Sequence, residues 1–201
     1  MKVAMIGAGG WGTAMMISLA ARHDDLFMYC RNPKTAQEMQ KSRENTNYLP
    51  GCRIPLHVKI TSTLETAVKG AGCVILCTPS HAVAAMAESL VPWLEKDTVV
   101  VCASKGLADH AGHRLSEVIT DKVKGITKKI VVLSGPNHAE EVGRGLPCAT
   151  VAASEVPEAV QVVQDLFMSP VFRVYRSDDI KGVEYGGALK NIMALACGVL
   201  D

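Results

Sequence analysis

The feature that most constrains the fold is a glycine-rich turn near the N-terminus, which joins a short apolar run to a helical stretch. The apolar run covers residues 2–6, the glycines follow as Gly7-x-Gly9-x-x-Gly12, and the helical pattern extends to about Arg22. A strand and a helix joined by so tight a turn are typical of a parallel α/β sheet. In such a turn Gly7 permits the sharp bend, Gly9 permits a ligand to approach the backbone, and Gly12 permits the helix to pack on the strand.

The rest of the chain alternates short apolar runs with helical stretches, which favours the same fold class. We expect further strands at 26–30, 57–61, 73–77, 98–103, 130–134, 148–153 and 171–175. We expect helices from Pro33, after a capping box at 62–65, over 78–94, through 114–118, from 135–137, over 157–168 and from 180 onward. The stretch 44–56 contains two prolines and a glycine and is predicted to be a loop.

Composition excludes several classes of protein. Of the 201 residues, 48% are hydrophobic and 20% are charged, which excludes a wholly disordered chain. The net charge of +1 provides no long-range field for nucleic acid or an anionic membrane. No run reaches the roughly 18 apolar residues that a membrane span needs. We therefore expect a small-molecule partner, no nucleic acid and no stable membrane insertion.

The seven cysteines argue for a reducing compartment. Their number is odd, no C-x-x-C pair occurs, and most of them lie inside apolar runs such as 73–77. A disulfide framework or a zinc site is therefore not expected, and we predict a cytoplasmic protein without a metal.

The glycine-rich turn has the context of a dinucleotide-binding fingerprint, in which free amides near Gly10 and Trp11 face an anion. The alternative is a turn that needs glycines for packing alone. The second strand ends in Arg31-Asn32 rather than in the carboxylate that grips the ribose of NAD. Arg31 can pair with the 2′-phosphate of NADP, so NADP is favoured and NAD is tolerated. The alternative is a solvated arginine.

Two lysines are candidates for holding a small anion. Three segments follow predicted strands and should converge at one edge of the sheet: 78–81, 104–106 and 134–137. Lys105 lies in the second of them, and its ammonium group is a compact phosphate partner, although a surface lysine is the alternative. Lys190 follows Gly186 by one helical turn, and the glycine suggests a close approach to the helix backbone. A lysine that reaches solvent at a domain junction is the alternative there.

Several motifs in one order resemble the bacterial-type NAD(P)-dependent glycerol-3-phosphate dehydrogenases from the first strand to residue 201. They are the glycine-rich turn with Thr13-Ala14, Ser104-Lys-Gly-Leu107, the stretch from Ser134-Gly-Pro136 to Glu141-Val142, Gly145-Leu-Pro147 and Gly186-Gly-Ala-Leu-Lys190-Asn191. The resemblance implies a Rossmann-like, doubly wound, mostly parallel sheet. It also implies an oxidoreductase that interconverts sn-glycerol 3-phosphate and dihydroxyacetone phosphate and supplies phospholipid synthesis.

The resemblance also implies residue roles. Lys190 matches the proton acceptor, and Lys105 matches a residue that contacts both cofactor and substrate. The substrate-binding positions carried over are Lys105, Gly135, Asn137 and Lys190. The cofactor-binding positions are Gly7, Gly9, Gly10, Trp11, Gly12, Arg31, Asn32, Tyr48, Lys105 and Ala139. Asn137, His138 and Cys148 depart from the family, which usually has Ser or Thr, Phe, and Thr at these places.

The family pattern divides the chain into a dinucleotide-binding domain, 1–179, and the start of a helical substrate domain, 180–201. The remainder of that second domain, with part of the substrate clamp, is absent from these residues. We therefore expect the chain to be truncated and to turn over poorly alone, and the resemblance allows a homodimer of the full-length form. The alternatives are a non-catalytic NAD(P)-binding fragment and a related two-domain hydroxyacid or ketopantoate-type dehydrogenase.

Overall fold

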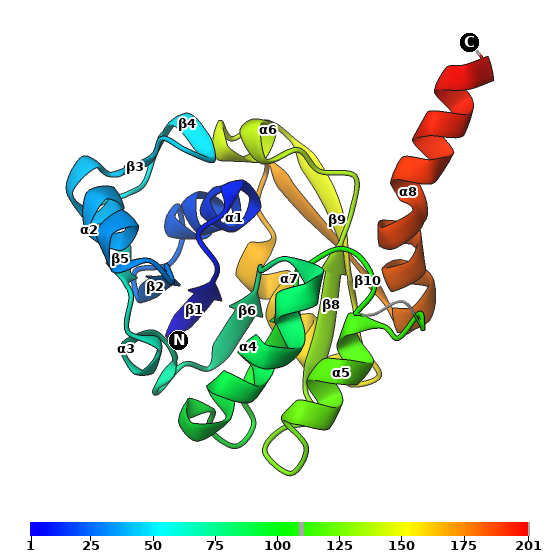
Figure 1. Ribbon diagram of the computed structural model, residues 1–201, viewed down its shortest axis with the longest axis horizontal. Coiled ribbons are helices and arrows are strands. Elements are labelled where there is room, and N and C mark those ends of the chain that lie inside the picture. The colour runs from blue at the N-terminus through cyan, green and yellow to red at the C-terminus, as the bar shows by residue number, and fades with distance from the viewer. Residues whose placement is uncertain (109–110, 201) are drawn as a thin grey trace.

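The large sheet contains eight strands, and each lies where an apolar run predicts one (Figure 1). The computed structural model describes residues 1–108 and 111–200. Neighbouring strands run parallel except for the antiparallel pair β8–β9. In spatial order the strands are β10 (Phe172–Ser177), β9 (Cys148–Ala153), β8 (Ile130–Ser134), β7 (Val99–Cys102), β6 (Cys73–Leu76), β1 (Val3–Ile6), β2 (Leu26–Tyr29) and β5 (Lys59–Thr61).

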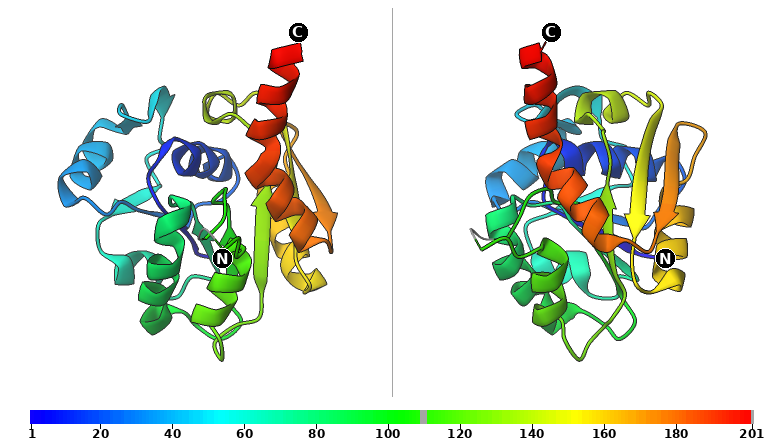
Figure 2. Two further views of the ribbon diagram at one scale, coloured as in Figure 1. Left: turned by 45° about the vertical axis from the view of Figure 1, so that its right-hand side comes forward. Right: turned by 90° about the vertical axis from the view of Figure 1, so that its right-hand side faces the viewer.

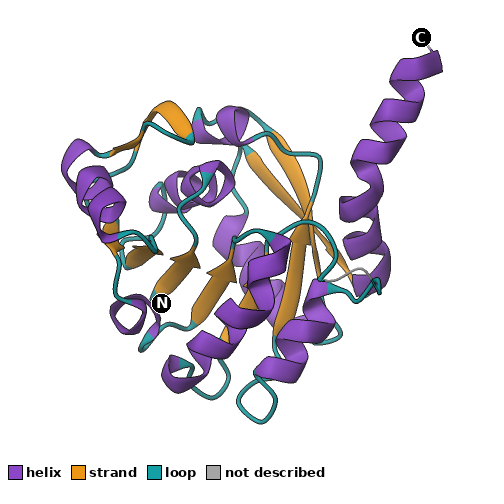
Figure 3. Ribbon diagram, in the orientation of Figure 1, coloured by secondary structure: helices purple, strands orange, loops and turns teal. Residues whose placement is uncertain are grey.

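Helices cover both faces of this sheet (Figure 3). The central strands β1, β6 and β7 are therefore buried at every residue, which explains their continuous apolar runs. The helices are α1 (Gly10–Ala20), α2 (Pro33–Ser42), α3 (Leu64–Val68), α4 (Val83–Leu90), α5 (Leu115–Lys122), α6 (Ala139–Gly143), α7 (Pro157–Phe167) and α8 (Ile180–Leu200), with the single 3₁₀ turns η1 (Ser80–Ala82) and η2 (Val91–Trp93).

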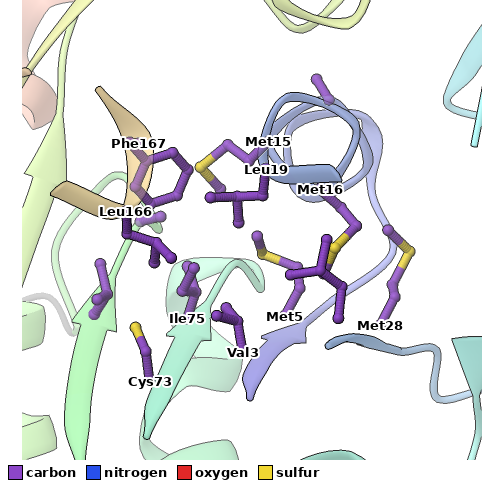
Figure 4. Packing of buried hydrophobic residues seen from close by; sticks show 14 of the residues in the cluster. Val3, Met5, Met15, Met16, Leu19, Met28, Cys73, Ile75, Leu166 and Phe167 are labelled. Atoms are coloured by element: carbon purple, nitrogen blue, oxygen red, sulfur yellow. The ribbon is translucent and has the colours of Figure 1, made fainter. Parts of the chain in front are cut away.

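Each face of the sheet has its own hydrophobic core. On one face α1 and α7 pack against the strands, with Met15 and Leu19 of α1 turned toward Phe167 of α7 (Figure 4). On the other face α3, α4 and α5 cover a second cluster, to which Ile180 and Val183 of α8 add partly buried side chains. The two cores hold the central strands between them, so the carboxyl ends of these strands form a fixed platform.

The order of the strands identifies where a ligand binds. From β1 the chain proceeds outward to β2 and β5 on one side, and then returns to β6, β7 and β8 on the other. The strand order therefore reverses between β1 and β6. In open α/β sheets ligands bind outside the carboxyl ends of the strands at such a reversal.

A small hairpin replaces the loop predicted at 44–56. It consists of β3 (Glu44–Asn45) and β4 (Leu49–Arg53), which pair antiparallel. Arg43 precedes it in a left-handed conformation with φ 58°, and its guanidinium donates hydrogen bonds to the carbonyl oxygens of Val58 at 2.8 Å and Leu56 at 3.0 Å. Tertiary contacts of this kind order a segment whose prolines and glycine favour a loop.

Three predicted helices differ from the structure, two in where they begin and one in its continuity. The capping box at 62–65 does not form, because α3 begins at Leu64 and its N-cap Thr63 makes no side-chain cap; Thr61 Oγ1 instead accepts from the Thr63 amide at 3.0 Å. α6 begins at Ala139 rather than at 135–137. The helix predicted over 78–94 divides into η1, α4 and η2, and η2 contains Pro92.

Helix α8 leaves the sheet and carries the C-terminus away from it (Figure 2). Its distal half presents large apolar side chains to solvent, including Ile192, Leu195 and Val199. Within residues 1–108 and 111–200, none of the helices is both long and apolar enough to cross a membrane.

Candidate active site

A cavity of about 360 Å³ lies where the strand order reverses, beside the N-terminus of α1. It is lined by Gly9, Gly10, Trp11, Gly12, Cys77, Thr78, Pro79, Ala103, Ser104, Lys105, Asn137 and Ala139. These residues come from four separate segments of the chain, each of which follows a strand of the sheet. Seven of the predicted site residues meet here: Gly9, Gly10, Trp11, Gly12, Lys105, Asn137 and Ala139.

Glycine is needed at positions 7, 9 and 12 of the turn for different physical reasons. Gly7 has φ +120°, and a Cβ there would overlap the carbonyl oxygen of Cys77. A Cβ on Gly12 would overlap the carbonyl oxygen of Gly7, so both residues permit close packing within the protein. A Cβ on Gly9 would meet no protein atom within 4 Å. The open space beside Gly9 is therefore left for something other than the protein.

The first turn of α1 is available to an anion. Gly9 is its N-cap and provides no side-chain cap, and the first turn contains no acidic residue. The leading amides of a helix have no intrahelical partner, and they carry the positive end of the helix dipole. The space beside Gly9 thus faces groups that bind a phosphate.

Unpartnered polar atoms gather in the same cavity. Among the described residues, five buried side-chain nitrogen or oxygen atoms have no hydrogen-bond partner, and four of these belong to residues that line it. They are Trp11 Nε1, Thr78 Oγ1, and Nδ2 and Oδ1 of Asn137. Buried polar atoms without partners are costly, so a polar ligand that pairs with them would remove the cost. The cavity suits part of a dinucleotide, with a phosphate at the helix and polar groups beside the unpartnered atoms.

Lys105 is the cation of this cavity. Its Nζ donates a hydrogen bond to the carbonyl oxygen of Gly135 at 3.1 Å and lies 5.7 Å from the centre of the Trp11 ring. Burial lowers the pKa of Lys105 below its ordinary value of 10.5, and the neighbouring charge of Lys190 lowers this pKa further. Burial also raises the pKa of the adjacent Cys77 thiol to about 12, so Cys77 stays neutral beside the lysine.

Lys190 reaches the site from α8. A second hollow of about 230 Å³ is lined by Ser134, Gly135, Pro136, Val151, Gly182, Val183, Gly186, Gly187 and Lys190. The carbonyl oxygen of Gly135, one of these lining residues, is the acceptor of the Lys105 hydrogen bond. Among the described residues, neither Lys105 nor Lys190 forms an ion pair with a carboxylate. Two neighbouring cations without a counter-charge are suited to an anionic ligand.

Besides Gly7, whose place is within the turn itself, three predicted cofactor residues line neither hollow. Arg31 is exposed just after β2. Asn32 caps α2, since its Oδ1 accepts from the amides of Lys34 at 2.9 Å and Thr35 at 3.2 Å. Tyr48 is 62% exposed, and its carbonyl oxygen lies 2.6 Å from where a Cβ on Gly10 would be. These residues lie on the β2 side of the turn, where an extended ligand would continue.

Sequence reasoning missed two contributors. Thr78 was recognised only as part of a segment after a strand; it lines the cavity, and its buried hydroxyl group has no hydrogen-bond partner. Asn45 is 1% exposed and donates from Nδ2 to the carbonyl oxygen of Ala8 in the glycine-rich turn at 2.9 Å. Neither residue belongs to a motif, and only the fold brings them to the turn.

A larger hollow than this cavity lies elsewhere. A groove of about 700 Å³ lies between α5 and the start of α8. Its buried polar side chains have partners: Ser154 Oγ donates to the carbonyl oxygen of Ile130, and Thr127 Oγ1 accepts from the Lys129 amide at 3.0 Å. The candidate site therefore differs from this groove in its unpartnered polar atoms and not in having a greater volume.

The comparisons with known families agree with this geometry. The family described as "NAD-dependent glycerol-3-phosphate dehydrogenase N-terminus" matches residues 2–160, and its C-terminal counterpart matches residues 179–201. Glycerol-3-phosphate dehydrogenase [NAD(P)+] of Moorella thermoacetica is 49% identical over 200 residues, and that of Pelotomaculum thermopropionicum is 42% identical over 201 residues. The chain is covered completely in both, and it spans 59% and 58% of their lengths.

Solved structures agree as well. The crystal structure of glycerol-3-phosphate dehydrogenase from Coxiella burnetii is 31% identical and superposes with a TM-score of 0.90 over 98% of this chain and 60% of that one. The likeness includes the eight-stranded, mostly parallel sheet and the helices on both of its faces. The prediction of a Rossmann-like fold is confirmed, and the chain belongs to the NAD-dependent glycerol-3-phosphate dehydrogenase family.

Proposed function

We propose that this chain provides the cofactor site and the proton acceptor of an oxidoreductase that interconverts sn-glycerol 3-phosphate and dihydroxyacetone phosphate. The observation that carries the proposal is the approach of Lys105 and Lys190, from two distant segments, beside the cavity at the glycine-rich turn. A phosphorylated three-carbon substrate brings the negative charge that these two ammonium groups lack.

The residues of the cavity suit NAD(P). The space beside Gly9 and the first amides of α1 would hold the pyrophosphate, while Trp11, Thr78 and Asn137 offer unpartnered polar atoms deeper in the cavity. Arg31 supports NADP over NAD, because the strand before it ends without a carboxylate. When bound, the cofactor supplies hydride-transfer chemistry.

The chain's own residues handle the proton and the phosphate. Lys190 Nζ accepts the proton of the secondary hydroxyl during oxidation and returns it to the carbonyl oxygen during reduction. Lys105, held by the Gly135 carbonyl, orients the substrate through its charge, and Asn137 donates to a substrate oxygen. We assign the 1–179 segment to cofactor binding and 180–201 to the start of a substrate-binding domain.

We further propose that the reaction takes place in the cytoplasm and supplies glycerol phosphate for phospholipid synthesis. The cytoplasmic assignment rests on the cysteines: all seven are free, and four of them are buried, where a thiol acts as a small apolar group.

The test measures NADPH oxidation with dihydroxyacetone phosphate, in the complete gene product and in the 201-residue chain. Lys190→Ala should lower kcat by at least 100-fold, a size typical of general acid–base catalysis, while NADPH affinity stays within about twofold. Ketopantoate and pyruvate serve as control substrates. Turnover of either in place of dihydroxyacetone phosphate, or full activity of Lys190→Ala, would refute the proposal, and NADPH binding without turnover would identify a binding module.

A further inference from the structure

Helix α8 is attached to the sheet domain through a buried charge. Glu184 is the one buried residue among the described residues of α8. Its Oε1 accepts from the Ser116 amide at 2.9 Å, and its Oε2 accepts from Arg114 Nη1 at 2.9 Å and from Ser116 Oγ at 2.5 Å. Both carboxylate oxygens are therefore engaged, which fixes the orientation of the side chain as well as its position.

The partner side of this contact is itself fixed. Arg114 is the N-cap of α5, and its Nη2 donates to Glu117 Oε1 at 2.6 Å. The Ser116 amide belongs to the first turn of α5, where backbone donors have no intrahelical partner. The carboxylate of Glu184 thus occupies a favourable place at the start of a helix, and the guanidinium is shared between two acids.

Stability alone does not explain a buried ion pair at this place. Taking two charges out of water costs about as much as their attraction returns, and apolar residues of similar volume hold such a contact equally well or better. The hydrogen bonds add a fixed orientation of helix α8 relative to the sheet domain. Apolar contacts tolerate sliding and rotation of a helix, whereas a carboxylate bound at both oxygens selects one register and one rotation.

The other contacts of α8 with the sheet domain are apolar or close-packed. Ile180 and Val183 pack against the second core. Gly187 lies against Ser134, since a Cβ there would overlap Ser134 Oγ. Beyond it the apolar side chains are exposed, with Leu189 at 47% and Ile192 at 60%. Lys190 follows Glu184 by six residues, or about 9 Å along the helix axis. The place of Lys190 beside Lys105 therefore depends on how the first turns of α8 are held.

We propose that Glu184, bound by Arg114 and Ser116, is a positioning residue that sets the register and rotation of α8 and thereby places Lys190 beside Lys105. The role of Lys190 as proton acceptor rests on the proposed function. The position of Lys190 beside Lys105 does not depend on that function. The contact joins residues 70 positions apart and acts on the site through the helix, without touching a ligand.

The test follows the Lys105 ammonium group by NMR in the complete gene product after reductive methylation with ¹³C-formaldehyde. Lys105→Arg assigns the Lys105 signal by removing it. Because the charge of Lys190 lowers the pKa of Lys105, Lys190→Met should raise this pKa. The pKa of Lys105 in that variant is the reference value for a protein in which Lys190 no longer lies beside Lys105. The double variant Arg114→Met with Glu184→Leu replaces the ion pair by apolar side chains and should raise the pKa of Lys105 toward the Lys190→Met value.

Thermal unfolding separates positioning from stability. The double variant should keep its Tm within a few degrees, since apolar replacement of a buried pair is often neutral or stabilising. Should it fail to fold, Glu184→Gln decides the question: this amide keeps the shape, loses an acceptor for Arg114, and should shift the pKa of Lys105 in the same direction. The control Glu65→Gln removes the exposed Glu65–Lys69 pair and should leave Lys105 unchanged.

An unchanged Lys105 titration in a folded double variant, or in Glu184→Gln if the double variant unfolds, would overturn the proposal. The titration needs neither cofactor nor substrate, so it stands even if the proposed reaction is refuted. If that reaction holds, the double variant should lose about 10- to 100-fold in kcat, as expected for a misplaced catalytic group, with NADPH affinity retained.

Discussion

Asn45 donates a hydrogen bond from Nδ2 to the carbonyl oxygen of Ala8 over 2.9 Å, which ties the β3–β4 hairpin to the glycine-rich turn. The same nitrogen donates to Thr13 Oγ1 at 2.8 Å, and Thr13 Oγ1 in turn donates to the carbonyl oxygen of Gly9 at 2.8 Å. Two carbonyl groups of the turn are thereby occupied by the protein. Their acceptor oxygens are held inside the fold, while the amide side of the turn remains for an anion.

Replacing Asn45 by alanine should both destabilise the protein and weaken dinucleotide binding. The loss leaves the Ala8 carbonyl without its partner in a partly buried place, which costs about 1–3 kcal/mol. For a chain of this size that corresponds to a fall in Tm of roughly 2–10 °C. Differential scanning fluorimetry measures the stability and calorimetric titration with ADP-ribose measures the affinity. Asn47→Ala, at an exposed position of the same hairpin, is the control and should change neither quantity.

Alanine at two glycines of the turn should separate binding from folding. Gly9 has an ordinary φ of −78° and open space at the Cβ position, so Gly9→Ala should leave Tm unchanged or slightly raised while ADP-ribose affinity falls at least tenfold. Gly12→Ala places a Cβ against the Gly7 carbonyl and should lower Tm by several degrees. Loss of stability in Gly9→Ala without loss of affinity would contradict the assignment of this space to a ligand.

The central strands of the large sheet could be predicted from the sequence because both of their faces are buried, whereas the edge strand β10 alternates buried and exposed residues. Runs such as Val99–Cys102 and Ile130–Ser134 are apolar at nearly every position, which is the pattern of a covered parallel strand. The antiparallel direction of β9 has no such local signal. The β3–β4 hairpin was missed because side-chain contacts of Arg43 and Asn45 order it, and its own residues favour a loop.

The site could be predicted only in part for a similar reason. The glycine-rich turn and Lys105 directly follow strands, so their place at the carboxyl edge follows from the topology. Asn45 and Glu184 act through contacts with residues far away in the chain, and no spacing in the sequence indicates those contacts. The proposed role of Lys190 as proton acceptor comes from the resemblance to a family. The helical pattern alone left two interpretations open, a base and a surface lysine.

Arg31 tests the choice between the two nicotinamide cofactors. It is exposed at the carboxyl end of β2, where it can pair with a 2′-phosphate. Hydrogen bonds to charged groups contribute about 1.5–3 kcal/mol, so Arg31→Asp should change the ratio of the KM values for NADPH and NADH by about 10- to 100-fold, toward NADH. Arg173→Asp on the far edge strand β10 is the charge-matched control. An unchanged ratio in Arg31→Asp would show that this arginine does not read the phosphate.

The pair of lysines predicts a pH-dependent anion site. Lys105 binds an anion in its charged form, and burial followed by the charge of Lys190 lowers its pKa. Sulfate affinity should therefore fall as the pH rises, beginning below the range in which an ordinary lysine loses its proton. Sulfate remains a dianion throughout, so the dependence belongs to the protein.

Two substitutions check this assignment by calorimetric titration with sulfate. Lys105→Met should weaken sulfate binding about tenfold near neutral pH and remove most of its decline at alkaline pH, because the titrating cation is gone. Lys190→Met should weaken binding as well but move the remaining decline to higher pH, since the pKa of Lys105 rises when its cationic neighbour is lost. Lys96→Met, at an exposed position before β7, should match the unaltered protein. A decline that persists unchanged in Lys105→Met would assign the titration to another group.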